Sequence, residues 1–527
     1  MLLAGLVALA LIASVLVLVR GTGTIEGVAG GAKVEQRGPA GVTVPGLERF
    51  YAQRLWWAGC EAYATGRDER AAFGVKGVEC ARVDVPLDYA KPDGEVASLG
   101  LLRRPASDPT RRIGSLLVNP GGPGASGMVA AATLSKQVGE SELGARFDLV
   151  GFDPRGIGAS TPAVRCLTTD ERDAERLDLD VDTSPEGVAQ TERENADYAA
   201  KCKQRVGVDL LANVGTRDVA RDLDVIRSVL GDQKLTYLGY SYGTRIGAAY
   251  AQAFAGNVRA MVLDGALDPS QNPVDEVVKQ TGAFQSAFEA YARHCASDGK
   301  CPLGDDPARA AAEFRRLVGP LIERPVNVQT RKLSYTDAIT GVIAALYDDQ
   351  LWDLLDQALD ELARGEGTVL LYLADSYYGR SGGEYSTLTD AFTAIHCVDE
   401  PPMTDRAAAR EADRRARAAA PFLDDGQPPS GALDVCAFWP VPPTSTPAVP
   451  TLPTLTGLPP VMVISTTGDP ATPYEAGIAL AKALGGRLLT YEGTQHTVFL
   501  RGVECVDTAG VAYLIDGTLP AEGTRCR

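Results

Sequence analysis

The fold follows from Leu235-Thr-Tyr-Leu-Gly-Tyr-Ser241-Tyr-Gly-Thr-Arg-Ile-Gly-Ala-Ala-Tyr250, a stretch that reads as a strand, a sharp turn and then a helix. Its centre, Gly239-Tyr-Ser241-Tyr-Gly243, matches the Gly-x-Ser-x-Gly pattern. In this pattern a serine sits on a strained turn, and the glycines on both sides let the strand and the helix approach each other. Apolar residues precede the turn and recur after it at helical spacing. We therefore expect Ser241 to be a nucleophile at the tip of a strand.

A second match to the same letters lies in Gly379-Arg-Ser381-Gly-Gly383. No β-rich apolar run precedes it and no clear amphipathic run follows it, so the strand and helix that the turn requires are missing. The sequence predicts a loop around Ser381 and leaves Ser241 as the nucleophile.

Composition limits the partners and the compartment. The chain has 527 residues and a formal net charge of −17, which argues against nucleic acid and anionic lipid as main partners because both need clustered positive charge. The even number of cysteines, ten, fits an oxidising compartment, and none forms a Cys-x-x-Cys pair. Closeness along the chain suggests the pairs Cys60–Cys80, Cys166–Cys202, Cys295–Cys301, Cys397–Cys436 and Cys505–Cys526.

The N-terminal segment points to export. Residues 1–19 carry no charge and are followed by Arg20, so 1–20 is expected to be a secretory signal or a membrane anchor. A glycine-rich linker over 21–45 follows. In either case the protein is expected to be secreted or to lie in the cell envelope, with membrane association through 1–19 if that segment is retained.

The order of strands and helices predicts an α/β fold with a mostly parallel sheet, helices on both of its faces, and an inserted helical cap. Residues 46–269 form the first part of the core, in which we expect a helix over 47–57 and a polar excursion over 160–213. The pattern becomes helical over 270–450, the cap, and a stretch rich in proline and threonine then leads back to the sheet. Residues 451–527 complete the core.

A serine hydroxyl needs a base within reach and an acid that orients the base. The chain has three histidines, and only His496 follows the last expected strands of the sheet. Asp469 follows the expected strand 460–465, at the tip where α/β-hydrolases carry their acid, and the order Ser, Asp, His is theirs as well. The sequence thus predicts a Ser241–His496–Asp469 triad, with the backbone N–H groups of Gly122 and Tyr242 as the oxyanion hole.

Rival uses of the glycine loop that begins at Pro120 are disfavoured. A phosphate-binding loop would carry a Gly-Lys-Ser/Thr element, which is absent, and Pro120 and Pro123 remove two backbone donors. No His-Glu-x-x-His is present either. We expect no metal and no cofactor.

Together these motifs resemble the secreted tripeptidyl aminopeptidases, relatives of prolyl iminopeptidase. The resemblance covers about 80–527 in matching order and rests on Asn119-Pro-Gly-Gly-Pro-Gly124, Gly151-Phe-Asp-Pro-Arg-Gly-Ile-Gly158, Gly239-Tyr-Ser-Tyr-Gly-Thr244, Gly468-Asp-Pro-Ala-Thr-Pro473 and Gly493-Thr-Gln-His496. It implies a serine exopeptidase without a cofactor that removes short peptides, often tripeptides, from the free N-termini of peptides or proteins, with the cap over the active site.

An exopeptidase of this kind must bind a substrate ammonium, for which a partly buried carboxylate is the natural partner. The candidates are Asp264, after an expected strand, and Asp399 and Glu400 in the cap. Two other functions remain open: a carboxylesterase or lipase that uses the same triad, and a hydrolase fold without activity that serves for binding.

Overall fold

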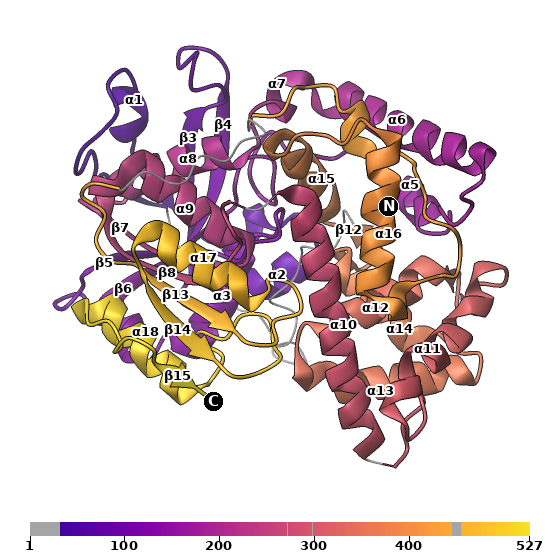
Figure 1. Cartoon of the computed structure of the whole chain (residues 1–527). Helices are drawn as coiled ribbons and strands as arrows, with labels where there is room; N and C mark the ends of the chain where they lie inside the picture. The colour runs from indigo at the N-terminus through magenta and orange to yellow at the C-terminus, as the bar shows by residue number, and fades with distance from the viewer. Residues whose placement is uncertain (1–31, 271, 298, 445–454) are drawn as a thin grey trace, which may run out of the picture.

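The computed structural model describes residues 32–270, 272–297, 299–444 and 455–527. At its centre is one large sheet, built from β3 (Glu79–Pro86), β4 (Val96–Arg104), β5 (Gly114–Asn119), β6 (Phe147–Phe152), β7 (Leu235–Tyr240), β8 (Val258–Asp264), β13 (Met462–Thr466), β14 (Arg487–Tyr491) and β15 (Arg525–Cys526). The strand order is β15-β14-β13-β8-β7-β5-β6-β4-β3 (Figure 1). β4 is antiparallel to both of its neighbours, and every other pairing is parallel. The predicted α/β fold with a mostly parallel sheet is confirmed.

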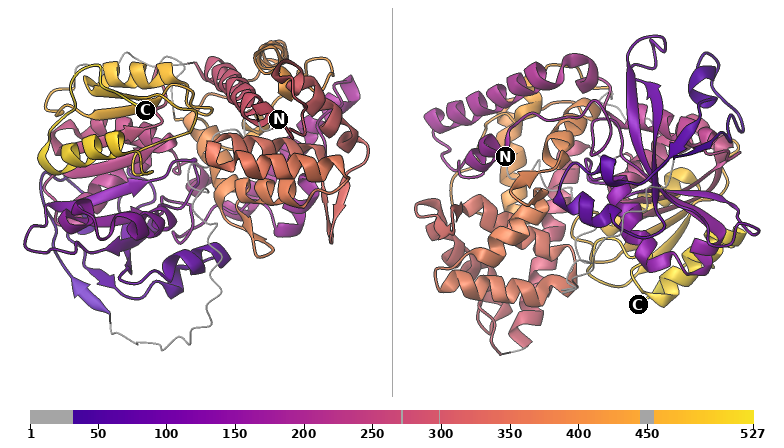
Figure 2. Two further views of the ribbon diagram at one scale, coloured as in Figure 1. Left: turned by 90° about the horizontal axis from the view of Figure 1, so that it is seen from below. Right: turned by 180° about the vertical axis from the view of Figure 1, so that it is seen from behind.

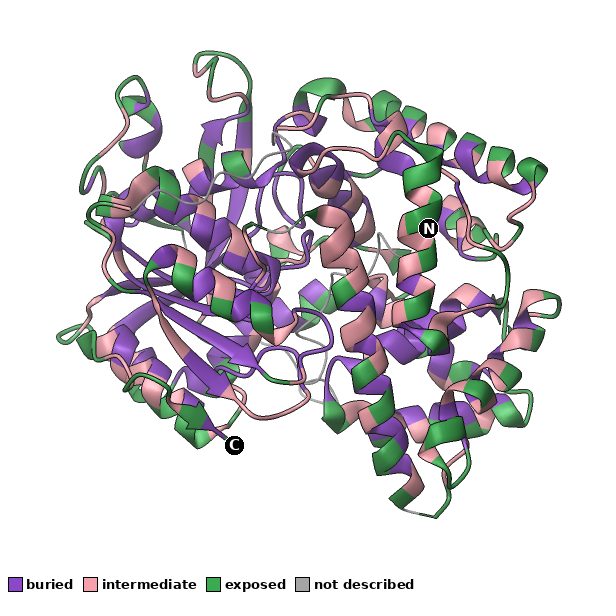
Figure 3. Cartoon of the chain, viewed as in Figure 1, coloured by how far each residue is buried: buried purple, intermediate pink, exposed green. Residues whose placement is uncertain are grey.

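Helices cover both faces of this sheet. One face packs against α1 (Glu48–Tyr51), α8 (Thr216–Val229), α9 (Tyr242–Phe254) and α17 (Tyr474–Leu484). The other face packs against α2 (Arg67–Phe73), α3 (Gly127–Val138), α4 (Glu142–Arg146) and α18 (Glu504–Asp516). Because both faces are covered, the central strands β5, β6 and β7 are buried along their whole length (Figure 3). Their continuous apolar runs are the pattern expected of parallel strands.

A second, helical layer lies beside the sheet (Figure 2). It contains α10 (Pro273–Ser297), α11 (Ala310–Val318), α12 (Tyr335–Leu346), α13 (Trp352–Ala363), α14 (Thr368–Tyr377), α15 (Leu388–Asp399) and α16 (Arg406–Ala419). Most of these helices share an apolar core of their own. Two short hairpins join them: β9 (Val326–Val328) with β10 (Arg331–Leu333), and β11 (Arg380–Ser381) with β12 (Glu384–Tyr385). Ser381 therefore lies in a hairpin strand, where the sequence predicted a loop, and no helix follows it directly.

The segment predicted as a polar excursion is mostly helical, with α5 (Thr169–Glu175), α6 (Pro185–Val206) and α7 (Val208–Leu211). It packs against the helical layer rather than projecting from the core. Arg176 donates to Asp337 over 2.8 Å, and Arg406 donates to Glu192 over 2.7 Å. The 22-residue α6 is largely polar because only one of its sides is covered, and this composition made it read as a loop.

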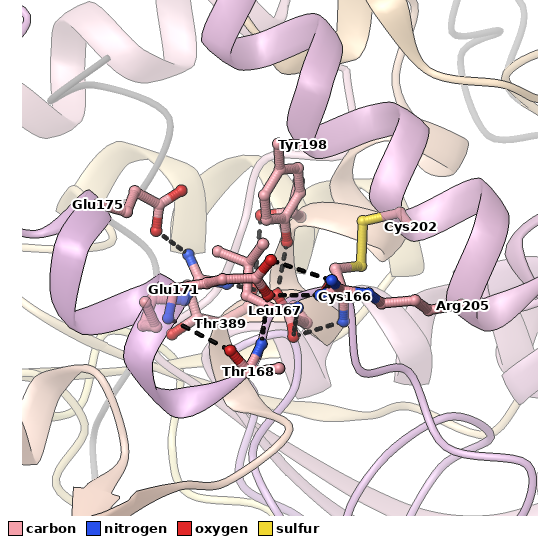
Figure 4. Close-up of a disulfide and its surroundings, with 12 residues drawn as sticks. Cys166, Leu167, Thr168, Glu171, Glu175, Tyr198, Cys202, Arg205 and Thr389 are labelled. Carbon is pink, nitrogen blue, oxygen red and sulfur yellow. Dashed lines mark hydrogen bonds and ion pairs between the residues drawn. A yellow bond between two sulfur atoms is a disulfide. The ribbon is translucent and has the colours of Figure 1, made fainter.

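A disulfide ties this segment together next to the helical layer (Figure 4). Cys166 in the loop before α5 is bonded to Cys202 in α6. The Asp390 carboxylate at the start of α15 accepts the Cys166 N–H over 2.7 Å and the Tyr198 hydroxyl over 2.7 Å. Arg205 donates to the Cys166 carbonyl over 2.6 Å. The loop is thus fixed by a covalent bond and by charge-assisted hydrogen bonds.

All five disulfide pairs expected from closeness along the chain are present: Cys60–Cys80, Cys166–Cys202, Cys295–Cys301, Cys397–Cys436 and Cys505–Cys526. Each closes a short or moderate loop, at most 39 residues apart in sequence. The prediction of a disulfide-bonded protein is confirmed.

The predicted helix over 47–57 is wrong in its second half. Only Glu48–Tyr51 is helical, and Leu55–Trp57 forms β2, which pairs antiparallel with β1 (Lys33–Glu35). Leu55 and Trp57 are buried while Trp56 between them is 54% exposed, an alternation typical of a strand. β1 also lies within the stretch predicted as a linker. In the described part of the chain, no helix has the length and apolar character needed to span a bilayer; residues 1–19 and much of the proline-rich stretch lie outside it.

Candidate active site

Ser241 occupies the turn between β7 and α9. Its backbone has φ 54° and ψ −125°, in the left-handed half of φ space that a non-glycine residue adopts at a cost of about 1–3 kcal/mol. The flanking glycines are required by space. A Cβ on Gly239 would lie 2.5 Å from the Gly243 carbonyl oxygen, and one on Gly243 would lie 2.8 Å from the Asn119 carbonyl oxygen. The turn that the sequence predicted around Ser241 is present.

His496 and Asp469 form the pair that the sequence predicted. The Nδ1 atom of His496 lies 2.9 Å from each carboxylate oxygen of Asp469, and both side chains are buried. Asp469 follows β13 and His496 follows β14, so both lie at the carboxyl edge of the sheet. With Nδ1 held by the carboxylate, Nε2 is the ring nitrogen left to exchange a proton.

The acid is itself held in place by the turn that follows it. The backbone N–H groups of Ala471 and Thr472 donate to Asp469 Oδ1 over 2.9 and 2.8 Å. The Thr472 hydroxyl donates to Asp469 Oδ2 over 2.9 Å and lies 3.3 Å from His496 Nδ1. Thr472 therefore contacts both members of the pair, a role that the sequence reasoning missed because a threonine in a proline-rich turn carries no signal of its own.

The His496 ring lies beside the strand next to Ser241. The Ser241 N–H donates to the Asp264 carbonyl at the end of β8 over 2.8 Å. A Cβ on the next residue, Gly265, would lie 3.0 Å from His496 Cε1. Ser241, His496 and Asp469 thus lie where the carboxyl ends of β7, β8, β13 and β14 meet, the place at which ligands bind in such sheets.

The glycine loop after β5 lies against the nucleophile turn. A Cβ on Gly121 would lie 2.5 Å from the Tyr240 carbonyl oxygen and 2.9 Å from both Ser241 Cβ and the Tyr242 nitrogen. The Gly121 N–H already donates to the Asn119 side chain over 2.9 Å. Gly122, with φ 111°, is the next donor along the loop. Tyr242 opens α9, so its N–H has no acceptor within the helix.

The end of the glycine loop is anchored by Asp153, which follows β6 and is buried. Its carboxylate accepts the Ser126 hydroxyl over 2.6 Å and the N–H groups of Met128 and Ala159 over 3.1 and 2.8 Å. Burial raises the pKa of Asp153 to about 6, although these hydrogen bonds favour its ionised form. The loop is therefore a rigid part of the site.

Comparison with known proteins agrees with this geometry. The family model of the alpha/beta hydrolase fold matches residues 114–503, most of the chain. The chain belongs to the α/β-hydrolase family. Its serine protease and tripeptidyl aminopeptidase relatives show that it is a serine hydrolase, and Ser241, Asp469 and His496 follow one another in the order typical of this family.

The relatives of this α/β-hydrolase carry different names. Serine protease Hip1 of Mycobacterium tuberculosis is 50% identical over 464 residues, which cover 85% of this chain and 87% of that protein. Carboxylesterase B of the same species is 48% identical over 492 residues, covering 93% and 92% of the two chains. Tripeptidyl aminopeptidase of Streptomyces coelicolor is 32% identical over 464 residues, covering 86% and 83%. The resemblance seen in the sequence motifs is confirmed.

Two of the three predicted amine-binding carboxylates serve the fold of the hydrolase instead. Asp264 is fully buried, and one of its oxygens accepts the N–H groups of Val498 and Phe499, each over 2.7 Å. Asp399 is 5% exposed and accepts the N–H of Thr216 over 2.8 Å, the Thr216 hydroxyl, and the Tyr242 hydroxyl over 3.2 Å. These predictions for Asp264 and Asp399 are corrected, because both carboxylates bind buried protein donors.

The third candidate, Glu400, belongs to a charged cluster above α9. Arg245, one turn after Ser241, donates to Glu400 over 2.5 Å, and His396 Nδ1 lies 3.6 Å from the other carboxylate oxygen. Burial opposes ionisation, but the neighbouring His396 and Arg245 hold the pKa of Glu400 below its usual value. Glu400 is thus an ionised carboxylate on the cap side of the site.

The sequence reasoning missed Glu276, in the first turn of α10. It is half-buried, and within the described residues no side chain donates a hydrogen bond to its carboxylate. Burial, and then the charge of Glu400, raise the pKa of Glu276 to about 7. One turn further along α10, Gln280 donates to the Ala471 carbonyl over 2.8 Å, which places this helix on the loop that carries the acid. Glu276 is therefore near enough to Glu400 for the two charges to interact, and it lies on the helix that is hydrogen-bonded to the loop carrying Asp469.

Metal ligands are not gathered in the described part of the chain. No group of three or more His, Cys, Asp or Glu side chains there is arranged to hold a metal ion.

Proposed function

We propose that this α/β-hydrolase is an exported serine exopeptidase that releases short peptides, and specifically tripeptides, from free N-termini. The acid pair Glu276–Glu400, next to the helix that begins at the nucleophile, is the observation that carries this proposal. A substrate ammonium is a ligand that such a pair favours, because the single positive charge of Arg245 does not balance two carboxylates. The names of two relatives, a serine protease and a tripeptidyl aminopeptidase, support the same reaction class.

In the proposed first step, Ser241 Oγ attacks the carbonyl carbon of the scissile peptide bond while His496 Nε2 takes the hydroxyl proton. The carbonyl π electrons move to the oxygen, which becomes an oxyanion and accepts hydrogen bonds from the N–H groups of Tyr242 and Gly122. Asp469 holds Nδ1 of His496 over 2.9 Å and stabilises the imidazolium that forms. The loss of either oxyanion donor typically slows such a step by about 100- to 1000-fold.

The tetrahedral intermediate then collapses. The C–N bond breaks, its electron pair leaves with the nitrogen, and His496 returns the proton to that nitrogen, so that the shortened peptide departs with a free amine. The released N-terminal segment remains as an ester on Ser241. A water molecule attacks this ester while His496 takes its proton, and collapse of the second intermediate regenerates the Ser241 hydroxyl and frees the short peptide.

Export is supported by the composition of the chain. Five disulfides are typical of an oxidising compartment, and residues 1–19 are uncharged. We propose a secreted or cell-envelope protein, whose substrates are the N-termini of peptides and proteins outside the cytoplasm.

A carboxylesterase activity is the second candidate, and the relative named Carboxylesterase B favours it. Esters and amides share the same triad and oxyanion hole, so the acid pair is what separates the two functions. An esterase has no need of a cluster that recognises an ammonium group.

The test compares three sets of substrates: peptides with a free amine, the same peptides N-acetylated, and short-chain esters. An aminopeptidase loses activity on the acetylated set, whereas an esterase prefers the third set. Ser241→Ala should abolish turnover, and Ser381→Ala, which changes the other serine in a matching motif, should retain it. Mass spectrometry of products from a free-amine peptide library gives the length released, and mainly single residues or dipeptides would contradict release of tripeptides.

A further inference from the structure

Asp264 and Gly265 lie at the centre of the carboxyl edge of the sheet. Asp264 ends β8 and Gly265 follows it; β8 lies between β7, which leads to Ser241, and β13, which leads to Asp469. The Asp264 carbonyl accepts the Ser241 N–H over 2.8 Å, and the Gly265 N–H donates to the Ile464 carbonyl in β13 over 3.2 Å. The backbone of these two residues therefore links the nucleophile turn to the strand that carries the acid.

The Asp264 side chain links the same point to the loop that carries the base. Its Oδ2 accepts the N–H groups of Val498 and Phe499, two and three residues after His496, each over 2.7 Å. The Tyr240 hydroxyl, from the residue before the nucleophile, donates to the Phe499 carbonyl over 3.0 Å. The backbone N–H and carbonyl of Phe499 are thus hydrogen-bonded to the side chains of Asp264 and Tyr240, which lie at the ends of β8 and β7 beside Ser241.

This loop needs such support because its backbone is strained. Thr497 has φ 62° and Leu500 has φ 61°, and neither is a glycine. Residues in this region persist only where the surrounding structure holds them. The two N–H groups bound by Asp264 lie between the two strained residues. Removal of that acceptor would let the loop relax and carry the His496 ring with it.

Gly265 determines how closely the ring approaches the sheet. Its φ is +69°, and a Cβ at this position would lie 3.0 Å from His496 Cε1, 2.9 Å from Thr497 Cγ2 and 3.2 Å from the Thr472 hydroxyl. Any side chain here would displace the imidazole or the threonine that supports the acid. The glycine is therefore required by the position of the base.

Asp264 also acts on the base through its charge. It is fully buried, and its Oδ1 has no hydrogen-bond partner among the described residues. Burial raises the pKa of Asp264 to about 6, the imidazole of His496 opposes this rise and the charge of Asp469 adds to it. Tyr240 is the further titratable group that faces the carboxylate. Above about pH 6, ionised Asp264 thus places a second negative charge near the base, in addition to that of Asp469.

We propose that Asp264 and Gly265 are positioning residues that set the distance between nucleophile and base, and that the Asp264 carboxylate stabilises the imidazolium formed during the reaction. The proposal rests on the Ser241–His496–Asp469 mechanism proposed above. In this mechanism neither Asp264 nor Gly265 contacts the substrate. Their replacement should therefore change kcat rather than KM.

Three variants of the full chain test this: Asp264→Asn, Asp264→Ala and Gly265→Ala, with Asp507→Asn as the matched control. Asp507 accepts the Leu500 and Gly502 N–H groups from the far end of the same loop, over 2.6 and 3.0 Å, so its variant separates general support of the loop from the proposed role. The number of reactive sites is determined by titration with a fluorophosphonate. kcat per reactive site and KM are then measured for one peptide and one ester across pH.

Asparagine keeps an oxygen for the two N–H groups but removes the charge. Asp264→Asn should fold and show kcat per site about 3- to 30-fold below wild type above pH 6, because the imidazolium formed in the reaction loses a stabilising anion. It should also lose the pH dependence near 6 that ionisation of Asp264 gives to the wild-type kcat. Asp264→Ala and Gly265→Ala should lower kcat about 100-fold with little change in KM, the effect of displacing a catalytic group by about 1 Å. The control should keep the wild-type pH profile.

A purely structural role would reduce the number of reactive sites and leave kcat per site and the pH profile unchanged. That result in Asp264→Asn overturns the inference, even if the alanine variants fail to fold. This outcome differs from a failure of the proposed Ser241–His496–Asp469 mechanism. If Ser241→Ala is inactive while Asp264→Asn matches wild type per site, only the positioning role falls; activity in Ser241→Ala removes the mechanism as well.

Discussion

Replacing Glu276 by glutamine should separate substrates that carry a free amine from those that do not. The change keeps the size of the side chain and removes the charge of an acid that faces Glu400 at the end of the site. A hydrogen bond to a charged group contributes about 1.5–3 kcal/mol, which corresponds to about 10- to 150-fold in kcat/KM. We expect a loss of that size for free-amine peptides and less than about threefold for esters, which make no such contact.

The pH dependence gives a second measure of the same contact. Burial and the charge of Glu400 raise the pKa of Glu276 to about 7, and only the ionised carboxylate attracts an ammonium. Binding should therefore improve as the pH rises through about 7 and weaken again as the α-amino group of the substrate loses its proton near pH 7.7–8.0. KM for free-amine peptides should pass through a minimum between these values, and Glu276→Gln should remove its acidic side.

The assay measures initial rates for a peptide amide, its N-acetylated form and a short-chain ester from pH 5.5 to 9, for wild type, Glu276→Gln and Glu400→Gln. Glu289→Gln is the control, because this exposed acid lies on the same helix α10. Glu400→Gln should act in the same direction and also free Arg245 from its partner. An equal loss on peptide and ester would refute the reasoning, since it would place Glu276 in the fold and not at the substrate amine.

Other perturbations test the support of the site. Thr472→Val keeps the backbone N–H that binds the acid but loses the hydroxyl bonded over 2.9 Å, so kcat/KM per reactive site should fall about tenfold, as measured with both peptide and ester. Gly121→Ala should lower Tm and abolish labelling by a fluorophosphonate, because its Cβ would meet a carbonyl oxygen at 2.5 Å in a residue with φ 92°; full labelling would contradict this. Replacement of Cys166 and Cys202 by serine should lower the free energy of unfolding by about 2–4 kcal/mol, seen in denaturant titrations. Burial raises the pKa of Asp264 to about 6 in the folded protein, so between about pH 4 and 6 its carboxyl group binds more protons in the folded than in the unfolded state. The free energy of unfolding should therefore fall by about 3 kcal/mol as the pH rises through this range. Asp264→Asn should lack this pH dependence of stability. If Tm changes with pH equally in the variant and the wild type between pH 4 and 7, Asp264 is not its source.

The central geometry was predictable because it depends on local sequence. The turn at Ser241 needs glycines at fixed offsets, and Asp469 and His496 each lie in a short loop that follows a strand. With three histidines in the chain, His496 was the one that follows the final strands. Its contacts with Asp469, 2.9 Å to each oxygen, agree with that prediction. The disulfides were predictable for the same reason, since their partners are near in sequence.

The missed features depend on contacts between distant segments. β2 pairs with β1 some 20 residues earlier in the chain, and no local period distinguishes that strand from an aromatic helix. An acid such as Glu276 in the first turn of a helix is ordinary, because it complements the helix dipole. The effect of Glu400 and Arg245 on its charge arises only in the folded chain, where these distant residues come near it. In the same way, the sequence suggested that the Asp399 carboxylate could bind a ligand, but its oxygens accept hydrogen bonds from buried donors of α8 and α9.

The helical layer of this hydrolase supports the loops that carry Asp469 and His496. Tyr347, at the end of α12, accepts the His496 N–H over 2.8 Å, and Gln280 in α10 donates over 2.8 Å to the carbonyl of Ala471, whose N–H holds the acid. Because the loops of His496 and Asp469 are each hydrogen-bonded to a residue of the helical layer, a change in this layer that moves Tyr347 or Gln280 should also shift the triad. Selection for a new substrate would therefore favour cap side chains that take no part in these two contacts, and Glu276, one turn from Gln280, is such a residue.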